Sequence, residues 1–590
     1  MSFQEDNQKG KQLNREATGD GTLDLFGRPA VKCKTGGWFT SSLILGTQGF
    51  AAVGYFGVCT NLILYLTRVL HEGNAVAANN VSNWIGTSYV TSLIGGFLGD
   101  AYLGRFWTAA VFLVIYLLGM VLLTLTATVK AFKPPACTRN QSFCPKTSPE
   151  KTTLLYVALY IIALGYGGHQ PCLTSLGADQ FDKEDPKEQT EATRFFSWYY
   201  MSITFGAITA GVLFVYVEDN IGWGVGFGLS TAAAVAAVVA FFIGAPRYRQ
   251  QRTGGNPFTR VAQVFNAALH KHHVKVPSDS SLLYEVDFKG SAIQGSRKIL
   301  HSDEFRYLDK AATEIDSDTV AGTSEKNPWR LCTITQVEEV KCILRILPIW
   351  ASSILFSTLY TQMSTLFVEQ GATMNTHVAG FKIPPASLST FTMISVLLSA
   401  PTYEYVVVPL GRKITGNKRG LTSLQRMGVG LIVVTVAMIF AALVEIFRLK
   451  SARAHGLIDA AKPVPMSVFW QIPQYFLVGA SEVFTYIGQL DFFYEESPDA
   501  IRSLSVALSP TSFALGNYVS SLLVTCVMEL TSKGARLGWI PNNLNRGHLD
   551  YYFWLLSAIS ILNLAFYLAC AIWYKFIQID RHDDAAREEP

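Results

Sequence analysis

Apolar stretches of about twenty residues recur along most of this chain, and they restrict its fold more than any other feature. A helix rises 1.5 Å per residue, so about 20 residues cross the ~30 Å hydrocarbon layer of a membrane. We identify twelve such spans, six on each side of a polar middle segment. They cover residues 39–65, 76–99, 106–130, 152–176, 194–217, 222–244, 343–368, 386–409, 424–447, 467–490, 501–530 and 551–575. The sequence therefore predicts an all-α membrane protein.

The composition agrees with this class and argues against several others. Hydrophobic residues make up 49% of the 590 residues and charged residues only 16%, which is too apolar for an ordinary soluble protein. A net charge of +4 gives no basic excess for nucleic acid. The nine cysteines lack the spacing of a disulfide scaffold or a zinc site. We expect neither a metal nor a cofactor.

No catalytic constellation points to an enzyme. The glycines of Gly224-x-Gly226-x-Gly228 lie inside an apolar span without a preceding strand, so close helix packing explains them better than a dinucleotide does. A P-loop is also missing, which disfavours transport driven by ATP.

The spans and the distribution of Lys and Arg predict the topology. An even number of spans returns the chain to its starting side, where the basic residues are more numerous, so both termini are expected in the cytosol. We favour the plasma membrane over the vacuolar membrane. The expected parts are a cytosolic tail (1–37), a six-helix half (38–245), a cytosolic linker with some lateral helix (246–341), a second six-helix half (342–576) and a cytosolic tail (577–590).

Two polar segments allow more than one interpretation. The loop 131–150 carries Cys137, Cys144 and the glycosylation sequon at Asn140, which would suit a disulfide and a glycan on the outer side, although the three can also occur together by chance. In the linker, the run His270-Lys271-His272-His273 could bind a metal, but a solvated face is the simpler explanation.

The two halves share motifs at equivalent loops. Asp179-x-Phe181-x-x-Glu184-x-Pro186 recurs as Asp491-x-Phe493-x-x-Glu496-x-Pro498, and Leu103-Gly104-Arg105 recurs as Leu410-Gly411-Arg412. Duplicated six-helix halves are the organisation of secondary transporters, in which the halves rock around a central site. The expected partners are a small-molecule or ion substrate and membrane lipid, and the oligomeric state is left open.

Several motifs carry a family resemblance. The segment from Gly99 to Phe106 resembles the loop signature of the major facilitator superfamily, which makes Asp100 and Arg105 candidate gating residues. With Gly177-Ala178-Asp179-Gln180-Phe181-Asp182, residues 488–493 and Ile383-Pro384-Pro385-Ala386-Ser387, the chain resembles the plant nitrate/peptide transporter family, a branch of the proton-dependent oligopeptide transporters. The resemblance implies a twelve-helix major facilitator bundle.

Departures from the family pattern define the candidate substrate site. The family's first helix usually carries Glu-x-x-Glu-Arg, where this chain reads Gln48-Gly49-Phe50-Ala51-Ala52, so it resembles a subgroup without that proton relay. Gln170 stands where a Lys is common, Tyr360 where nitrate-binding relatives have a His, and Thr204 in place of a usual Asn. Together with Ser364, these residues are the expected substrate-binding positions.

Glu482 is the acid that we find deep within a predicted span, and it completes this site. An ionisable side chain in hydrocarbon is costly and usually functional, so Glu482 is a candidate for binding both substrate and proton. A structural contact between helices is the alternative. His169 is a second proton-coupling candidate, because it either faces the pathway or packs against a neighbouring helix.

The family resemblance favours low-affinity nitrate transport with weak or atypical proton coupling. Exchange of potassium for a proton on Glu482 is the main alternative, because a carboxylate attracts a cation. Transport of another organic solute, such as a peptide, a hormone or a specialised metabolite, is also open. A receptor that binds without transporting is the least favoured reading.

Overall fold

The computed structural model describes most of the chain between residues 18 and 576. The segments outside the description are 1–17, 19–21, 26, 33, 134–147, 183–184, 252–256, 278, 280–281, 287–298, 316–317, 319–325, 379, 417–419, 460–461, 498–501, 534–536 and 577–590. Cys137, Asn140 and Cys144, the candidate disulfide and glycosylation residues, therefore lie outside the described residues.

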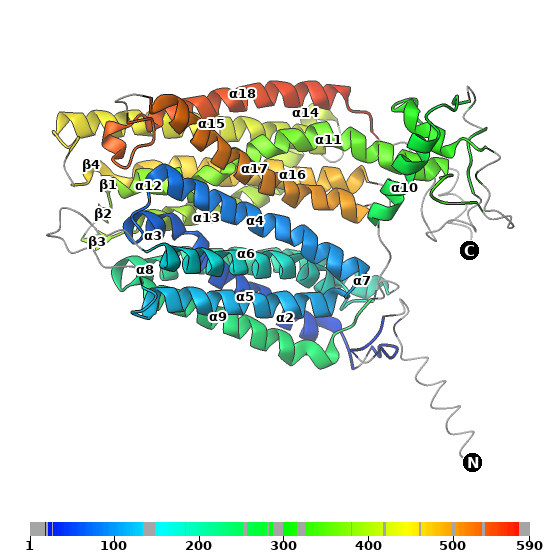
Figure 1. The fold of residues 1–590 in the computed structure, drawn as a ribbon, viewed down its shortest axis with the longest axis horizontal. Helices are drawn as coiled ribbons and strands as arrows, with labels where there is room; N and C mark the ends of the chain where they lie inside the picture. The colour runs from blue at the N-terminus through cyan, green and yellow to red at the C-terminus, as the bar shows by residue number, and fades with distance from the viewer. Residues whose placement is uncertain are drawn as a thin grey trace, which may run out of the picture.

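Twelve membrane-length helical rods form two bundles of six, as the sequence predicts (Figure 1). The first bundle contains α2 (Gly37–Cys59) with α3 (Leu62–Arg68), α4 (Asn74–Ala101), α5 (Arg105–Thr128), α6 (Pro149–Ala178), α7 (Pro186–Thr209) with the π-helix η1 (Ala210–Phe214) and α8 (Val215–Asn220), and α9 (Trp223–Gly244) with η2 (Ala245–Arg247). We call this bundle the N-half.

The second bundle, the C-half, has the same number of rods. It contains α11 (Ile334–Tyr360) with η7 (Thr361–Ser364) and α12 (Leu366–Ala372), η8 (Pro385–Ser389) with α13 (Thr390–Thr402), η9 (Tyr403–Val407) and α14 (Val408–Thr415), α15 (Ser423–Ala454), η10 (Val468–Gln471) with α16 (Ile472–Glu495), α17 (Arg502–Thr531), and α18 (Leu549–Trp573) preceded by η11 (Leu544–Arg546).

Ten of the rods within the described residues are long and apolar enough to cross a membrane. The other two, α4 and α16, have 28 and 24 residues and are more polar, as expected of helices that face the interior of a bundle. The halves meet mainly where α4 packs against α17, with a smaller contact between α7 and α13.

The linker and a few short strands mark the two ends of the bundle. Helix α10 (Pro257–His270) and η5 (Arg306–Ala312) lie at one end, which we call the linker end (Figure 1). At the opposite end, β1 (Met374–Asn375) pairs in parallel with β4 (Val464–Ser467), and β2 (His377–Val378) pairs antiparallel with β3 (Phe381–Lys382).

The linker is more ordered than the sequence analysis expected. Apolar side chains of α10, η5 and the start of α11 form a small core, and Lys271 is buried against Asp318 with Nζ 2.7 Å from Oδ2. Burial raises the pKa of the Cys332 thiol in this core to about 12, in keeping with a packing role. The lateral helix was expected, but the small core was not, because it depends on contacts between distant residues.

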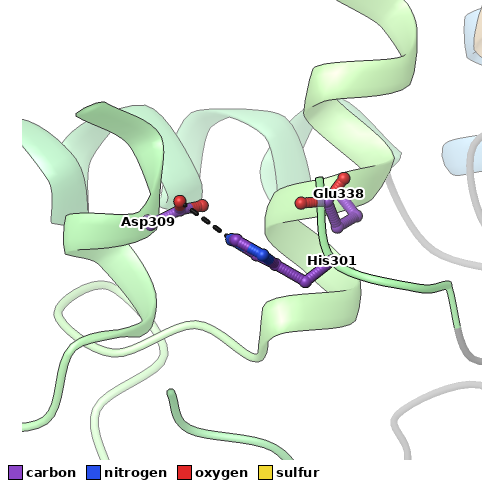
Figure 2. A group of neighbouring side chains, drawn as sticks. All are labelled: His301, Asp309 and Glu338. Carbon is purple, nitrogen blue, oxygen red and sulfur yellow. Dashed lines mark hydrogen bonds and ion pairs between the residues drawn. The ribbon is translucent and has the colours of Figure 1, made fainter. Parts of the chain in front are cut away.

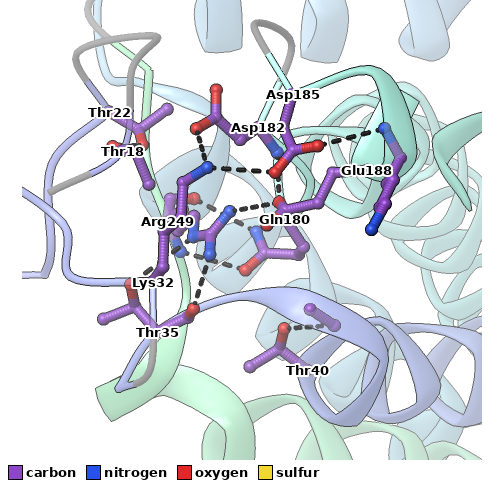
Figure 3. A network of polar contacts seen from close by, with 12 residues as sticks. Thr18, Thr22, Lys32, Thr35, Thr40, Gln180, Asp182, Asp185, Glu188 and Arg249 are labelled. Carbon is purple, nitrogen blue, oxygen red and sulfur yellow. Dashed lines mark hydrogen bonds and ion pairs between the residues drawn. The ribbon is translucent and has the colours of Figure 1, made fainter. Parts of the chain in front are cut away.

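A chain segment that precedes α2 is fixed to the linker end of the N-half (Figure 3). The Arg249 guanidinium is buried and donates to the Glu188 carboxylate at 3.0 Å and to the Thr35 carbonyl at 2.9 Å. Beside it, Lys32 Nζ lies 2.9 Å from Asp182 Oδ2 and 3.2 Å from Asp185 Oδ2. These pairs hold the start of α2 against the ends of α6 and α9.

Glycines allow the helices of the N-half to pack closely. A Cβ on Gly226 would lie 2.1 Å from Glu218 Cγ, and one on Gly224 would lie 2.8 Å from Thr128 Cγ2, so these two glycines have the predicted packing role, whereas a Cβ on Gly228 would meet no atom within 4 Å. The tightest crossing joins α4 to α6, where a Cβ on Gly95 would lie 2.0 Å from the Gly168 carbonyl oxygen.

We predict that Gly95→Ala lowers the midpoint temperature of thermal unfolding of the detergent-solubilised protein. The added methyl group would force α4 and α6 apart, and overpacking of this kind costs about 1–3 kcal/mol. Gly96→Ala is the matched control, because its Cβ would have Pro171 Cβ at 3.7 Å as nearest neighbour, an ordinary contact. Equal shifts in the two variants would contradict the close crossing.

Candidate transport site and gates

The candidate site is built around Glu482 on α16. The Tyr360 hydroxyl at the end of α11 donates to Glu482 Oε2 at 3.0 Å, so the structure joins two residues that the sequence analysis singled out. Glu482 is partly exposed, whereas its neighbours Ser481 and Val483 are fully buried. The carboxylate therefore faces a space inside the bundle rather than a packed helix interface.

A cluster of aromatic rings, which we call the aromatic cage, includes Tyr360, the hydrogen-bond partner of this carboxylate. The Phe513 ring of α17 lies 5.6 Å from the Tyr360 ring, 5.1 Å from the Tyr486 ring and 5.4 Å from the Tyr89 ring, measured between centroids. Tyr89 belongs to α4 of the N-half and the other rings belong to the C-half. The site thus lies at the interface between the two halves, where alternating access requires it.

In the described part of the chain, the site holds an acid without a basic partner. Among the described residues, Tyr360 is the hydrogen-bond partner of Glu482, and no lysine, arginine or histidine forms an ion pair with it. The hydroxyls of Tyr89, Tyr200 and Tyr486 are close enough to Glu482 to interact with it electrostatically. Such a site offers a carboxylate, hydroxyl oxygens and aromatic faces, which together suit a cation.

Three of the predicted site residues are buried among their neighbours. His169 packs against Tyr116 and Tyr166, and its Nδ1 lies 2.9 Å from the Gly165 carbonyl oxygen, so the described contacts of this proton-coupling candidate are those of a buried side chain. Gln48 is fully buried, and the Thr204 hydroxyl donates to the Tyr200 carbonyl at 3.0 Å. The described contacts do not bring these residues to Glu482.

Gln170 and Ser364 remain partly exposed. Ser364 lines a small cavity of about 30 Å³ between the halves, with Cys59 and Thr390 among its neighbours. The backbone carbonyl of Gln170 accepts from the Tyr199 hydroxyl at 3.2 Å. Neither side chain contacts Glu482 in the described structure.

The sequence analysis missed Tyr486, Phe513 and Tyr89. Tyr486 follows Glu482 by four residues, so helical periodicity places it on the same face and was a usable signal. Tyr89 and Phe513 come from other helices, and only the folded structure brings them together.

At the linker end, Arg105 joins three helix ends of the N-half. Its Nε lies 2.9 Å from Asp100 Oδ1 and its Nη1 lies 2.5 Å from Asp179 Oδ2. The side chain of Asp179 is 1% exposed and that of Asp100 is 42% exposed. The predicted partners are thus adjacent, and Asp179 of the repeated motif is the more buried acid.

The C-half has an equivalent pair with a different arginine. Arg426 Nη1, at the start of α15, lies 2.9 Å from Asp491 Oδ2, near the end of α16, and its guanidinium also lies over the Tyr403 ring at 4.1 Å. The repeated motif pointed to Arg412, but its side chain is exposed on α14. The two halves therefore share an ion pair between the third and fourth rods, but the Leu-Gly-Arg motif does not mark the arginine of the C-half.

At the opposite end, contacts join the two halves directly. Asp219 of α8 forms two ion pairs. Its Oδ1 lies 2.7 Å from Nη1 of Arg68 in the same half, and its Oδ2 lies 2.7 Å from Nζ of Lys382 in the C-half. The Thr67 hydroxyl donates to Glu369 Oε1 at 3.1 Å, and the Asn79 amide donates to the Thr525 hydroxyl at 2.8 Å. The structure therefore has the halves in contact on the side away from the linker.

Within the described residues, one group of side chains has the composition of a metal site (Figure 2). His301, Asp309 and Glu338 place ligand atoms within 4.8 Å of one another where the linker meets α11. The Lys341 ammonium already lies 2.7 Å from Asp309 Oδ1 and 2.8 Å from Glu338 Oε1. The lysine supplies the positive charge here, so the cluster is an ion-pair network that fastens the linker.

Comparison with known proteins gives consistent matches. The model of the POT family matches residues 106–540. The chain is 50% identical to "Protein NRT1/ PTR FAMILY 8.3" of Arabidopsis thaliana over 94% of each chain, and 52% identical to "Protein NRT1/ PTR FAMILY 8.1" of the same plant over 95% of this chain and 97% of the relative.

Solved structures agree on the fold. An auto-inhibited POT family peptide transporter has a TM-score of 0.68 at 20% identity and covers 92% of this chain and 98% of its own. A POT family transporter in complex with 5-aminolevulinic acid has a TM-score of 0.60 at 13% identity, covering 91% and 97%.

We predict that Asp179→Asn lowers stability and turnover more than Asp100→Asn does. Breaking a buried pair costs about 3 kcal/mol, whereas an exposed pair contributes less than about 1 kcal/mol. Thermal unfolding and uptake rates measure the two effects. If Arg105 acts through Asp179, combining Arg105→Gln with Asp179→Asn should cost less than the sum of the single changes, and strictly additive losses would contradict that.

Proposed function

The chain belongs to the POT family of transporters, and on this premise we propose that it carries a small organic solute whose protonated amine binds at Glu482. The protein is a multi-pass membrane transporter with the twelve-helix major facilitator fold, and it is not an enzyme. The observation that supports an amine is a carboxylate at the interface of the halves, beneath an aromatic cage and without a cationic partner among the described residues.

The chemistry of the cage favours an organic cation. An ammonium group can donate to the Glu482 carboxylate while its alkyl part contacts the rings of Tyr89, Tyr486 and Phe513. A potassium ion could use the carboxylate and the Tyr360 hydroxyl but would gain little from the apolar ring of Phe513. Exchange of potassium for a proton is therefore the weaker reading.

Nitrate, which the family resemblance favoured, fits this site less well. An anion would approach a carboxylate, and no described lysine, arginine or histidine pairs with that group to offset the repulsion. Nitrate could bind only when Glu482 is protonated and acts as a donor. The names of the similar plant proteins give membership of the NRT1/ PTR family and no substrate, so they do not choose between these substrates.

The contacts between the halves support a particular conformation and orientation. We place the termini and the linker in the cytosol, because Lys and Arg are more numerous on that side, and we favour the plasma membrane. In that orientation the outer side is closed by Asp219 with Lys382 and by Thr67 with Glu369. The domain limits predicted from the sequence remain part of this proposal.

We predict that Glu482→Gln reduces uptake of amine-bearing solutes by about ten- to a hundredfold in oocytes. A hydrogen bond to a charged group contributes about 1.5–3 kcal/mol, and each 1.4 kcal/mol corresponds to a factor of ten. Labelled dipeptide, 5-aminolevulinic acid, rubidium and nitrate are compared at two external pH values.

Asp459→Asn, which changes an exposed loop acid paired with Arg546, controls for expression and handling. The proposal is wrong if the wild type moves nitrate but neither amine, or if Glu482→Gln leaves amine uptake intact while reaching the membrane in equal amount. Loss of rubidium flux alone would support the potassium reading.

The orientation gives a further prediction. Treatment with an endoglycosidase should shift the mobility of the wild type and not that of Asn140→Gln, because the sequon then lies outside. A membrane-impermeant amine reagent should leave Lys310, which lies in the linker, unmodified in intact cells. Labelling of Lys310 from outside would reverse the topology.

A further inference from the structure

A second acid lies between the halves, at the end opposite the linker. Glu369 belongs to α12 of the C-half, is 6% exposed, and accepts from the Thr67 hydroxyl of α3 in the N-half at 3.1 Å. Sequence analysis ended the seventh span at residue 368 and so did not consider this residue. Helix α3 of the N-half packs against α12, so the contact between the halves contributes to the burial of this acid.

The charged groups around Glu369 are few. Of the elements packed against α12, β1, η7, η8 and η10 carry no acidic or basic side chain, and the single charged residue of α4, Asp100, lies at the linker end. Arg68 of α3 acts on Glu369 from a distance, but its guanidinium is bonded to Asp219 at 2.7 Å. The tyrosine of α3, Tyr65, packs in an aromatic cluster with Trp223.

The other side of α12 meets a closed ion pair. Gln370 donates to Glu445 Oε2 at 2.9 Å, and Glu445 is bound through both oxygens to Arg448 at 2.6 and 2.8 Å. That arginine is therefore committed to Glu445. Asp219 is likewise committed to Arg68 and Lys382. Glu369 is the acid of this interface that has a hydroxyl rather than a basic group as its bonded partner.

We propose that Glu369 binds a proton from the outer compartment when the outer side closes and returns it to the same compartment when the halves separate. Burying an ionised carboxylate without a bonded cation is costly, and a bound proton removes that cost. Opening exposes the carboxylate to water, where the ionised form is well solvated. By linkage, an acidic outer compartment shifts the transporter towards the closed outer gate.

This site changes how protons affect transport. Because the proton enters and leaves on one side, Glu369 makes the rate of transport depend on external pH without carrying a proton across the membrane. The proposal goes beyond the choice of substrate, since Glu369 lies at the outer gate and Glu482 lies in the aromatic cage. It supplies a pH response to a chain that has Gln48, Ala51 and Ala52 where the family carries ionisable groups.

The test measures the gate itself, without substrate. Spin labels are placed at Ile221 of the N-half and Leu537 of the C-half, which are 66% and 53% exposed at the outer end, in protein reconstituted in nanodiscs. Electron–electron resonance then gives the fractions with short and long label distances between pH 5 and pH 8. In the wild type we expect the closed-to-open ratio to rise by up to tenfold for each unit of acidification, the limit for one proton.

Glu369→Gln should keep the gate closed at every pH, because the amide is neutral. Glu218→Gln is the matched control: Glu218 is also a buried acid near the outer end, but its bonded partner, the Asn61 amide at 2.9 Å, belongs to its own half. Glu218→Gln should keep the wild-type pH response of the gate, and so should Glu482→Gln. The gate proposal can therefore fail without affecting the proposal that an amine binds at Glu482, and the reverse also holds.

Three results would overturn the proposal. They are a wild type without a pH response, an unchanged response in Glu369→Gln, and loss of the response in both Glu369→Gln and Glu218→Gln. If Glu369→Gln does not fold, Thr67→Val serves instead. It removes the hydroxyl that bonds the acid across the interface and should move the midpoint of the pH response, and an unmoved midpoint would count against the proposal.

Discussion

A carboxylate that enters the membrane interior must be paired, hydrogen-bonded or left in contact with water, and this constraint organises the interior of the transporter. Glu445 satisfies it by binding Arg448 within one helix. Glu218 satisfies it with the Asn61 amide, in space that Gly226 leaves free. Glu369 lies across the contact between the halves, and Glu482 faces the space inside the bundle. Of these four acids, Glu369 and Glu482 lie where the halves meet, so they are the ones suited to a transport cycle.

Much of the fold could be predicted from the sequence, because apolar length and a repeated motif are local signals. The contacts between side chains inside the bundle were harder to predict from the sequence. Glu445 lay inside the predicted span 424–447, but its partner Arg448 fell one residue beyond that span, so the pair went unrecognised although it is readable at a spacing of three residues. The order in the linker depends on pairs such as Lys271 with Asp318, which are 47 residues apart and give no local pattern.

The two halves share a structural feature that the sequence motif marks in only one of them. Arg105 and Arg426 both stand at the start of the third rod of their half, and each reaches an acid near the end of the fourth, Asp179 or Asp491. The Leu-Gly-Arg motif marks only the first of these arginines. Since both pairs lie within a half, they keep each half rigid at the linker end while the contacts between halves form or break.

The two acids that we propose to act in transport belong to the same half of the chain. Glu369 and Glu482 both belong to the C-half, and the N-half residues described next to them are uncharged: Thr67 is bonded to Glu369, and Tyr89 lies in the cage. Among the described residues, neither acid therefore has a charged N-half partner to lose when the halves separate, and the ion pair between Asp219 and Lys382 is the charged contact that opening breaks. With that cost fixed, the protonation of Glu369 is the variable that we propose shifts the balance between the closed and open outer gate.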